Sequence, residues 1–242
     1  MIQQIYAHRG ASAYAPENTL EAFDMAAQMG AHGVELDVHI TKDGELVVAH
    51  DESIDRVSNG TGLIRNLTLA ELKQFAFNKT HPEFANAKMP TLKEVFELLK
   101  PTGLCINIEL KNSIFDYPDL ERKTIELAAR ENMLNRVLFS SFNHHSMKRI
   151  KDIDAGIRCG LLYEACMIKP WAYAVAVGAD ALHPHYSAVL TPGGTCGEAH
   201  KAGISVNPWT VNKEEDIRRV LAEGADIVIT NYPDIGLNCL NS

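Results

Sequence analysis

The stretch Gly30-Ala31-His32-Gly33-Val34-Glu35-Leu36 decides the fold of this chain. In it a helix-like run ends at a glycine and passes directly into a short β-rich run, which is typical of the loop that leads from a helix into a buried strand. The same transition returns at Gly156-Ile157-Arg158-Cys159, and at residues 178–182, 203–206 and 224–229. Its recurrence predicts an α/β protein.

Helix starts are marked as clearly as strand starts. Four segments place Asn or Thr three residues before Glu, the pattern of a capping residue and its partner: Asn18-x-x-Glu21, Thr68-x-x-Glu71, Thr91-x-x-Glu94 and Asn212-x-x-Glu215. Strands are predicted near residues 3–8, 33–38, 104–110, 136–140, 157–162, 179–183, 204–208 and 226–230. They are short and mostly apolar on both faces, as expected for a parallel sheet that helices cover.

Eight such strands, alternating with helices in a chain of 242 residues, favour a (β/α)8 TIM barrel. A doubly wound open sheet is the competing architecture. Residues 41–103 break the rhythm, because Lys42-Asp43-Gly44 predicts a tight turn, residues 46–49 a short extra strand, and two capped helices follow. We expect this segment to be a small insertion after strand two, within a single domain that spans residues 1–242.

Composition and charge narrow the class of protein. Apolar residues make up 46% of the chain and charged residues 22%, as in ordinary globular proteins. The net charge of −8 indicates neither nucleic-acid binding nor attraction to an anionic membrane. Five scattered cysteines without a CxxC pair predict reduced thiols. The N-terminus lacks the pattern of a secretory signal, and the most apolar stretch, residues 171–182, is too short to span a bilayer. We therefore expect a cytoplasmic protein.

Functional side chains gather where the predicted strands end, which is where TIM barrels carry their chemistry. The residues are His8 and Arg9 on strand one, Glu35 and Asp37 on strand two, His50 and Asp51 on the extra strand, and Glu109 and Lys111 on strand three. Residues two apart on a strand point to the same face, so Glu35 shares one side of the sheet with Asp37, and Glu109 with Lys111.

Three carboxylates that converge inside an apolar barrel would repel one another unless a cation held them. Oxygen ligands favour Mg²⁺, Ca²⁺ or Mn²⁺, so Glu35, Asp37 and Glu109 are predicted to bind one of these metals. The alternative is that each carboxylate is solvated or pairs with Arg9 or Lys111.

Two histidines and two cationic side chains complete the predicted site. His8 and His50 are candidates for a general acid and a general base near neutral pH, although a lone histidine is more often a satisfied core residue. Arg9 offers a fork that suits a phosphoryl group, unless it only neutralises Glu35 or Asp37. Lys111 would add positive charge where phosphate charge builds up.

At these residues the sequence resembles the glycerophosphodiester phosphodiesterase family. The likeness runs from His8 almost to the C-terminus, and the order and spacing of its motifs are specific. The matching segments are His8-Arg9-Gly10, Pro16-Glu17-Asn18-Thr19, Glu35-Leu36-Asp37-Val38, Thr41-Lys42-Asp43-Gly44, Val48-Ala49-His50-Asp51, Pro90-Thr91-Leu92, Asn107-Ile108-Glu109-Leu110-Lys111, Trp209-Thr210-Val211-Asn212 and Thr230-Asn231-Tyr232-Pro233-Asp234.

The resemblance implies a barrel with an insertion after strand two, and hydrolysis of glycerophosphodiesters such as glycerophosphocholine or glycerophosphoethanolamine to sn-glycerol 3-phosphate and an alcohol. The nucleophile would be water, or the neighbouring glycerol hydroxyl through a cyclic phosphate. Carried over residue by residue, the metal ligands fall on Glu35, Asp37 and Glu109, the catalytic histidines on His8 and His50, and the phosphate contacts on Arg9 and Lys111.

Further positions follow from the same resemblance. Phe142 and Trp209 would be apolar walls for the glycerol or alcohol moiety, or else packing at the barrel rim. Asn207-Pro208 depart from the apolar strand residues usual before this tryptophan. Capping and barrel-closing roles are expected for Asn18, Asn231 and Asp234.

Other functions stay open at this point. Lys111 beside Glu109 suggests a Schiff-base lysine of an aldolase-type enzyme, and a barrel that only binds phosphorylated metabolites is a third reading. A phospholipase acting on lysolipids is a variant within the family, but the sequence has no evident amphipathic segment, which favours a water-soluble headgroup. We expect a small-molecule substrate, no nucleic-acid partner and no stable membrane association.

Overall fold

The described part of the computed structural model, residues 2–191 and 195–241, contains eight parallel strands in one sheet. Their order is β8-β7-β6-β5-β4-β2-β1-β9, and a further strand, β3, pairs with β2. The bounds of the eight parallel strands are β1 Gln4–His8, β2 Gly33–Ile40, β4 Cys105–Leu110, β5 Val137–Ser141, β6 Cys159–Tyr163, β7 Ala181–Pro184, β8 Ser205–Val206 and β9 Ile227–Thr230. Each lies within or close to a predicted range.

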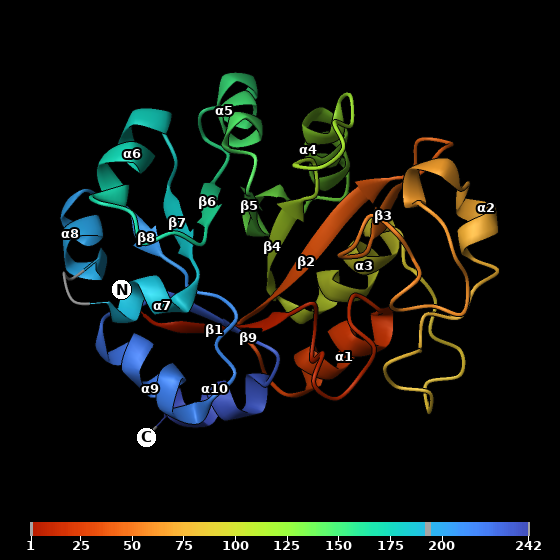
Figure 1. Cartoon of the computed structure of the whole chain (residues 1–242), viewed down its shortest axis with the longest axis horizontal. Helices are drawn as coiled ribbons and strands as arrows, with labels where there is room; N and C mark the ends of the chain where they lie inside the picture. Colours follow the sequence, from red (N-terminus) through yellow and green to blue (C-terminus); the bar gives the residue numbers. More distant parts are fainter. Residues whose placement is uncertain (1, 192–194, 242) are drawn as a thin grey trace.

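Backbone hydrogen bonds close the sheet between β8 and β9, the two strands at the ends of this order. The amide of Asp226 donates to the carbonyl of Val206 at 2.8 Å, and the amide of Ile229 donates to Pro208 at 3.0 Å. The eight strands thus form a nearly closed barrel with helices outside it (Figure 1). The predicted (β/α)8 barrel is confirmed, and the doubly wound open sheet is excluded.

Helices follow the strands and cover the outside of the barrel (Figure 1). The longer helices are α1 Leu20–Gln28, α3 Leu92–Leu99, α4 Leu120–Arg130, α5 His144–Ile153, α6 Pro170–Val177, α8 Thr195–Lys201, α9 Glu214–Ala222 and α10 Pro233–Leu240. The shorter ones are α2 Leu69–Leu72, α7 Tyr186–Leu190 and the 3₁₀ turns η1 Ile64–Asn66, η2 Lys100–Thr102 and η3 Leu134–Arg136. Their apolar faces and the outward side chains of the strands form one continuous core.

Strand β8 is shorter than the predicted range of 204–208, and Pro208 provides a physical reason. Proline has no amide hydrogen to donate to a neighbouring strand, so regular pairing stops near it. The chain nevertheless follows the barrel wall, because Asn207 donates its amide to Leu182 at 2.8 Å and Trp209 donates to Pro184 at 3.1 Å. Trp209 is therefore held at the rim by backbone bonds.

Two of the four predicted helix caps are confirmed and two are wrong. Thr68 and Thr91 form complete capping boxes at α2 and α3. The cap of α1 is Thr19, because Asn18 adopts a left-handed backbone with φ of 58° and directs its side chain elsewhere. The residue that precedes α9 is Lys213, which makes no side-chain cap, while Asn212 accepts a hydrogen bond from the amide of Asn231.

The segment between β2 and α3 has a small core of its own. Strand β3, Leu46–Val48, runs antiparallel to β2 with Val48 opposite Val38. Behind it lies a second cluster of buried side chains: Val47, Ala49, Ile54, Ile64, Leu72, Phe77 and Met89. Helix α3 falls within the range predicted as an insertion, yet its side chains belong to the main core. The small core anchors the strand that leads directly to His50.

A histidine that the sequence analysis did not single out is buried within the barrel wall. His183 on β7 is fully buried, and its ring lies over Gly160 of β6, where an added Cβ would come within 2.3 Å of Nε2. The side-chain amide of Asn207 donates from Nδ2 to His183 Nε2 at 3.0 Å. Burial lowers the pKa of His183 to about 3, so the ring is neutral in the folded protein.

This burial predicts a stability change with pH. The unfolded chain protonates His183 near its ordinary pKa of 6.5 while the folded chain does not, so stability falls as the pH drops from about 6.5 towards 3. We expect His183→Gln, which retains an acceptor for Asn207, to lose about 2 kcal/mol less unfolding free energy than the wild type between about pH 7 and about pH 5. Urea unfolding at both pH values measures the difference. Parallel pH dependences would contradict the prediction.

Candidate active site

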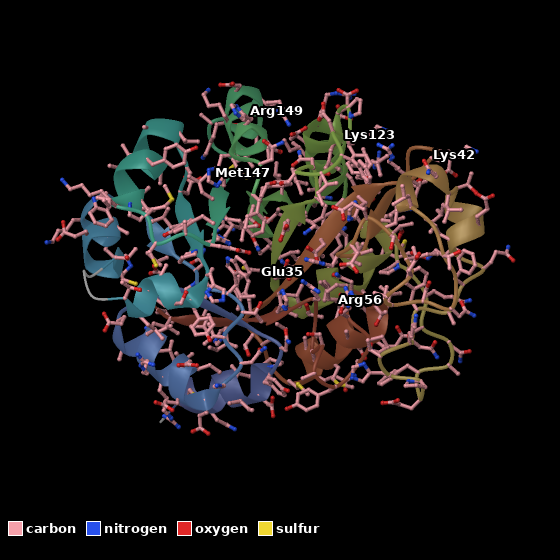
Figure 2. The ribbon with its side chains drawn as sticks, viewed as in Figure 1. Glu35, Lys42, Arg56, Lys123, Met147 and Arg149 are labelled. Carbon is pink, nitrogen blue, oxygen red and sulfur yellow. The ribbon has the colours of Figure 1, made fainter. Side chains whose placement is uncertain are left out.

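Three carboxylates meet at the carboxyl end of the barrel strands, and we call them the acidic cluster: Glu35, Asp37 and Glu109. Their nearest oxygens lie within 4.8 Å of one another, and at most 8% of each residue is exposed. Asp37 and Glu109 are direct neighbours in the register of β2 and β4. Glu35 lies near the centre of the molecule (Figure 2). The structure thus brings together the three residues predicted to bind metal.

The negative charge of the acidic cluster is only partly compensated. Burial and the neighbouring carboxylates raise the pKa of Glu35 well above its ordinary value. Burial also raises the pKa of Glu109, although Lys111 opposes it. Burial alone would raise the pKa of Asp37 as well, but Lys111 and Arg9 hold it far below its ordinary range. A site that confines charge in this way suits a hard divalent cation.

Arg9 and Lys111 lie against the acidic cluster. Lys111 Nζ is 2.9 Å from Glu109 Oε1 and 3.7 Å from Asp37 Oδ1, while Arg9 Nε is 3.4 Å from Asp37 Oδ2. The pairing offered as an alternative to metal binding is therefore present in part. It is incomplete, because Asp37 Oδ1 is buried without a hydrogen-bond partner. A buried carboxylate oxygen that has only a distant ion pair and no hydrogen bond, on a residue grouped with two other carboxylates, fits a metal ligand.

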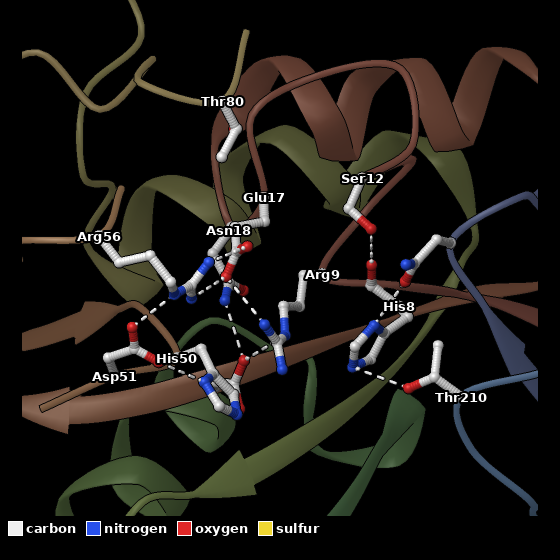
Figure 3. Close-up of polar contacts among 12 residues, drawn as sticks. His8, Arg9, Ser12, Glu17, Asn18, His50, Asp51, Arg56, Thr80 and Thr210 are labelled. Carbon is white, nitrogen blue, oxygen red and sulfur yellow. Dashed lines mark hydrogen bonds and ion pairs between the residues drawn. The ribbon is translucent and has the colours of Figure 1, made fainter. Parts of the chain in front are cut away.

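The two candidate histidines have different partners at Nδ1. Asn231 Oδ1 accepts from His8 Nδ1 at 2.7 Å, whereas the carboxylate of Asp51 bonds His50 Nδ1 at 2.7 Å (Figure 3). An amide oxygen can only accept a hydrogen bond, so the ring hydrogen of neutral His8 lies on Nδ1 and Nε2 carries none. Burial, reinforced by Arg9, lowers the pKa of His8 to about 3 and keeps the ring neutral.

A cavity opens above the acidic cluster, and both predicted aromatic residues line it. The rings of Phe142 and Trp209 meet edge to face, with centroids 5.5 Å apart. Trp209 is fixed from below, because its indole nitrogen donates to the carbonyl of His183 at 2.7 Å. The lining residues are His8, Arg9, Glu35, His50, Asn107, Glu109, Phe142, Leu162, Trp209, Thr210 and Ile229.

Several residues of the site have contacts that the sequence analysis did not predict. Asn18, expected to be a cap, donates its amide to Asp37 at 2.9 Å. Asn231, expected to close the barrel, orients His8. Glu17 and Arg56 link Arg9 to the segment that carries His50. Glu17, Asn18 and Asn231 stood in the quoted motifs, so their presence was visible there although their contacts were not.

TIM barrels carry their active sites at the carboxyl ends of the strands, so fold and site together define a barrel enzyme. The model of the glycerophosphoryl diester phosphodiesterase family matches residues 8–235. The chain belongs to this family, and it is an enzyme of the phosphoric diester hydrolase class.

Individual relatives agree with this assignment over nearly the whole chain. A glycerophosphodiester phosphodiesterase of Caldanaerobacter subterraneus is 42% identical over 97% of this chain and 96% of its own. One from Bacillus altitudinis is 37% identical over 96% of this chain and 95% of its own. An Oleispira antarctica phosphodiesterase, solved in complex with the product sn-glycerol-3-phosphate, superimposes with a TM-score of 0.87 at 31% identity, covering 100% of this chain and 98% of that one.

The two alternatives from other functional classes are not supported. A Schiff-base lysine needs a lowered pKa to be a nucleophile near neutral pH. Burial acts in that direction on Lys111, but the adjacent Glu109 and Asp37 raise its pKa above the ordinary value, so the amine is protonated. A barrel that only binds metabolites is excluded by membership of an enzyme family.

The bond between Asn231 and His8 can be tested by Asn231→Ala. Without the amide oxygen, the imidazole is free to change tautomer and orientation, so we expect kcat to fall by about tenfold or more. Asn241→Ala, an exposed residue at the end of α10, is the matched control and should leave kcat unchanged. Steady-state kinetics with a glycerophosphodiester measures both variants. A wild-type kcat in Asn231→Ala would mean that the bond does not serve the reaction.

Proposed function

We propose that this protein hydrolyses small glycerophosphodiesters, such as glycerophosphocholine or glycerophosphoethanolamine, to sn-glycerol 3-phosphate and an alcohol, and that it depends on a divalent metal. The observation that carries the proposal is the buried acidic cluster, two of whose members, Glu35 and Glu109, line one cavity together with His8 and His50. The sn-glycerol-3-phosphate bound by the Oleispira antarctica phosphodiesterase supports this choice of product.

Glu35, Asp37 and Glu109 are the residues that would hold the metal. Their donors are all carboxylate oxygens, which favours Mg²⁺, Ca²⁺ or Mn²⁺ over softer ions. A metal bound there would offset negative charge on the phosphoryl group during its transfer. Asn18 restrains Asp37 through a hydrogen bond of 2.9 Å, so that the carboxylate is oriented before any ligand arrives.

Arg9 and Lys111 are proposed to bind the phosphoryl oxygens. Both are cations close to the acidic cluster, and Arg9 also lines the cavity. The planar fork of an arginine can bind two oxygens at once, while a lysine acts as a point charge. Both would stabilise charge that increases in the transition state.

The partners of the two histidines suggest a division of roles. His8 is neutral and its Nε2 carries no hydrogen, so it suits the general base that takes a proton from the nucleophile. His50 Nδ1 bonds the carboxylate of Asp51 at 2.7 Å, an arrangement in which a carboxylate orients an imidazole that passes a proton through Nε2. His50 therefore suits the general acid that gives a proton to the leaving alkoxide.

Phe142 and Trp209 are proposed as walls for the organic part of the substrate. Both line the cavity, and the ring of Trp209 is held in place by His183 and Phe142. Aromatic faces attract a quaternary ammonium group, so a choline ester would find a favourable surface there.

A lysophospholipid is a second candidate substrate, and one observation favours it. Met167 and Ile168 before α6, and Tyr173 within it, expose large apolar side chains, and Ile168 is 91% exposed. Among the described residues, no helix has the length and apolar character needed to cross a membrane. An exposed apolar surface of this kind would suit the acyl chain of a lysophospholipid.

The deciding experiment is a panel of substrates and metals. Glycerophosphocholine, glycerophosphoethanolamine and lysophosphatidylcholine are each assayed with Mg²⁺, Ca²⁺ and Mn²⁺, and release of glycerol 3-phosphate or of the free alcohol is measured. The proposal expects turnover of the first two. Turnover of lysophosphatidylcholine alone would move the function to lysolipids, and no turnover of any of the three would refute it.

Removing the metal, or one of its proposed ligands, should have graded effects. Exhaustive chelation should abolish turnover, and adding the metal back should restore it. We expect Asp37→Ala to fold but to turn over about a hundredfold more slowly or worse, with only partial recovery at high metal concentration, because both geometry and occupancy change. Circular dichroism and metal-titrated kinetics measure these effects. Full activity after chelation would disprove the metal requirement.

The two histidine roles can be separated by the leaving group. We expect His8→Ala and His50→Ala each to lower kcat on glycerophosphocholine by about 10²–10⁴-fold. Nitrophenolate is a leaving group that needs no protonation. With glycerophospho-nitrophenol the loss of kcat in His50→Ala should therefore shrink strongly, whereas the loss of kcat in His8→Ala should persist. The opposite pattern would exchange the two roles, and wild-type turnover in both variants would remove them.

A further inference from the structure

Arg56 is an arginine of the segment between β3 and η1 that lies outside the cavity lining but bonds two carboxylates of the site. Its Nε donates to Asp51 Oδ2 at 2.6 Å, and its two terminal nitrogens donate to Glu17 Oε2 at 2.7 Å and Oε1 at 2.8 Å. A single guanidinium therefore spans two acidic side chains from different parts of the chain.

Each of these two carboxylates bonds a residue of the proposed chemistry. Asp51 bonds His50 Nδ1 at 2.7 Å, and Glu17 accepts from Arg9 at 2.9 Å. Figure 3 shows the guanidinium of Arg56 between them. The result is a chain of alternating acidic and basic side chains, which we call the charge chain: Asp37, Arg9, Glu17, Arg56, Asp51 and His50.

The charge chain joins three separate stretches of sequence. Asp37 lies on β2, Arg9 and Glu17 lie between β1 and α1, and His50 and Arg56 lie beyond β3. His50 follows β3 in a short irregular segment, so its ring orientation depends on what its side chain contacts. Asp51 is itself partly exposed, with 30% of its side chain accessible, and Arg56 fixes its second oxygen.

We infer that Arg56 is a positioning residue for the reaction: it orients the His50–Asp51 pair and, through Glu17, the guanidinium of Arg9. This inference rests on the proposed function of His50 and Arg9. The charges in the chain agree with it. Burial alone would raise the pKa of Asp51 and of Glu17, yet the hydrogen bonds from Arg56 hold both below their ordinary values, so both carboxylates stay ionised.

A positioning role and a stabilising role predict different outcomes. The side chain of Arg56 is 45% exposed, and ion pairs at that exposure contribute little to the free energy of unfolding. Misorientation of a catalytic group, by contrast, costs turnover even when the fold is intact. Loss of Arg56 should therefore lower kcat much more than it lowers thermal stability.

The test compares Arg56→Gln, Arg56→Lys and Arg56→Ala in the full-length, Mg²⁺-loaded protein with glycerophosphocholine. We expect kcat of Arg56→Gln to fall by about tenfold to a hundredfold, the usual loss when a residue that supports a catalytic group is removed. Arg56→Lys should recover only part of this loss, because a point charge cannot reproduce a fork that bonds two carboxylates. The midpoint of thermal unfolding should stay close to that of the wild type.

Chemical rescue separates positioning from a general structural effect. The Arg56 side chain reaches solvent, so methylguanidinium added to Arg56→Ala should occupy the vacated site and restore part of kcat. The same additive should not restore His50→Ala. Arg65→Ala is the matched control: Arg65 lies in η1, stacks on Phe115 and, among the described residues, forms no hydrogen bond or ion pair with a member of the charge chain, so its kcat should be unchanged.

A double-mutant cycle locates the effect. If Arg56 acts through Asp51, then Arg56→Gln should cost less in an Asp51→Asn background than in the wild type. Wild-type kcat in Arg56→Gln and Arg56→Ala, with His50→Ala inactive, would overturn this inference and leave the proposed function standing. Wild-type turnover in His50→Ala would overturn both. Full additivity in the cycle would place the effect of Arg56 outside the His50–Asp51 pair and overturn the positioning role assigned there.

Discussion

Negative charge confined at the carboxyl end of the barrel is the constraint on which the rest of the site depends. Glu35, Asp37 and Glu109 are buried with oxygens within 4.8 Å of one another, and mutual repulsion at that distance favours protonation of at least one of them. Arg9 and Lys111 supply part of the opposing charge. The buried Asp37 Oδ1 without a hydrogen-bond partner indicates where they fall short, and a divalent cation would remove the remainder.

The rigid backbone of the barrel makes this arrangement possible, because it holds together carboxylates that would otherwise move apart. Asp37 and Glu109 are register neighbours on β2 and β4, so their separation is set by backbone hydrogen bonds and not by side-chain preference. The closure between β8 and β9 brings Trp209 and Thr210 to the same rim as residues from β1. The hydrogen-bonded register of the parallel strands therefore sets the positions of these active-site residues.

The segment between β2 and α3 provides the part of the site that the parallel strands do not. It delivers His50 at the end of β3, and its own small core fixes that strand. The charge chain through Arg56 then connects it to the loop that carries Arg9. Two histidines of one site thus have different support: His8 bonds a neutral amide inside the barrel, while His50 bonds a carboxylate at its edge.

The sequence by itself determined the barrel, the positions of its strands, and the set of acidic, basic and histidine residues at their ends. It could do so because helix-ending glycines, apolar runs and two-residue spacing are local signals of backbone conformation. Caps at Thr68 and Thr91 followed the same logic. Asn18 and Asn212 did not, since each side chain is engaged by a residue distant in sequence: Asn18 by Asp37, and Asn212 by the amide of Asn231. The roles of Asn231 and Arg56 were likewise decided only by the tertiary structure. The hydrogen bond between His8 and Asn231 joins residues that are 223 positions apart in sequence. Such a bond depends on closure of the barrel, so no local sequence pattern predicts it.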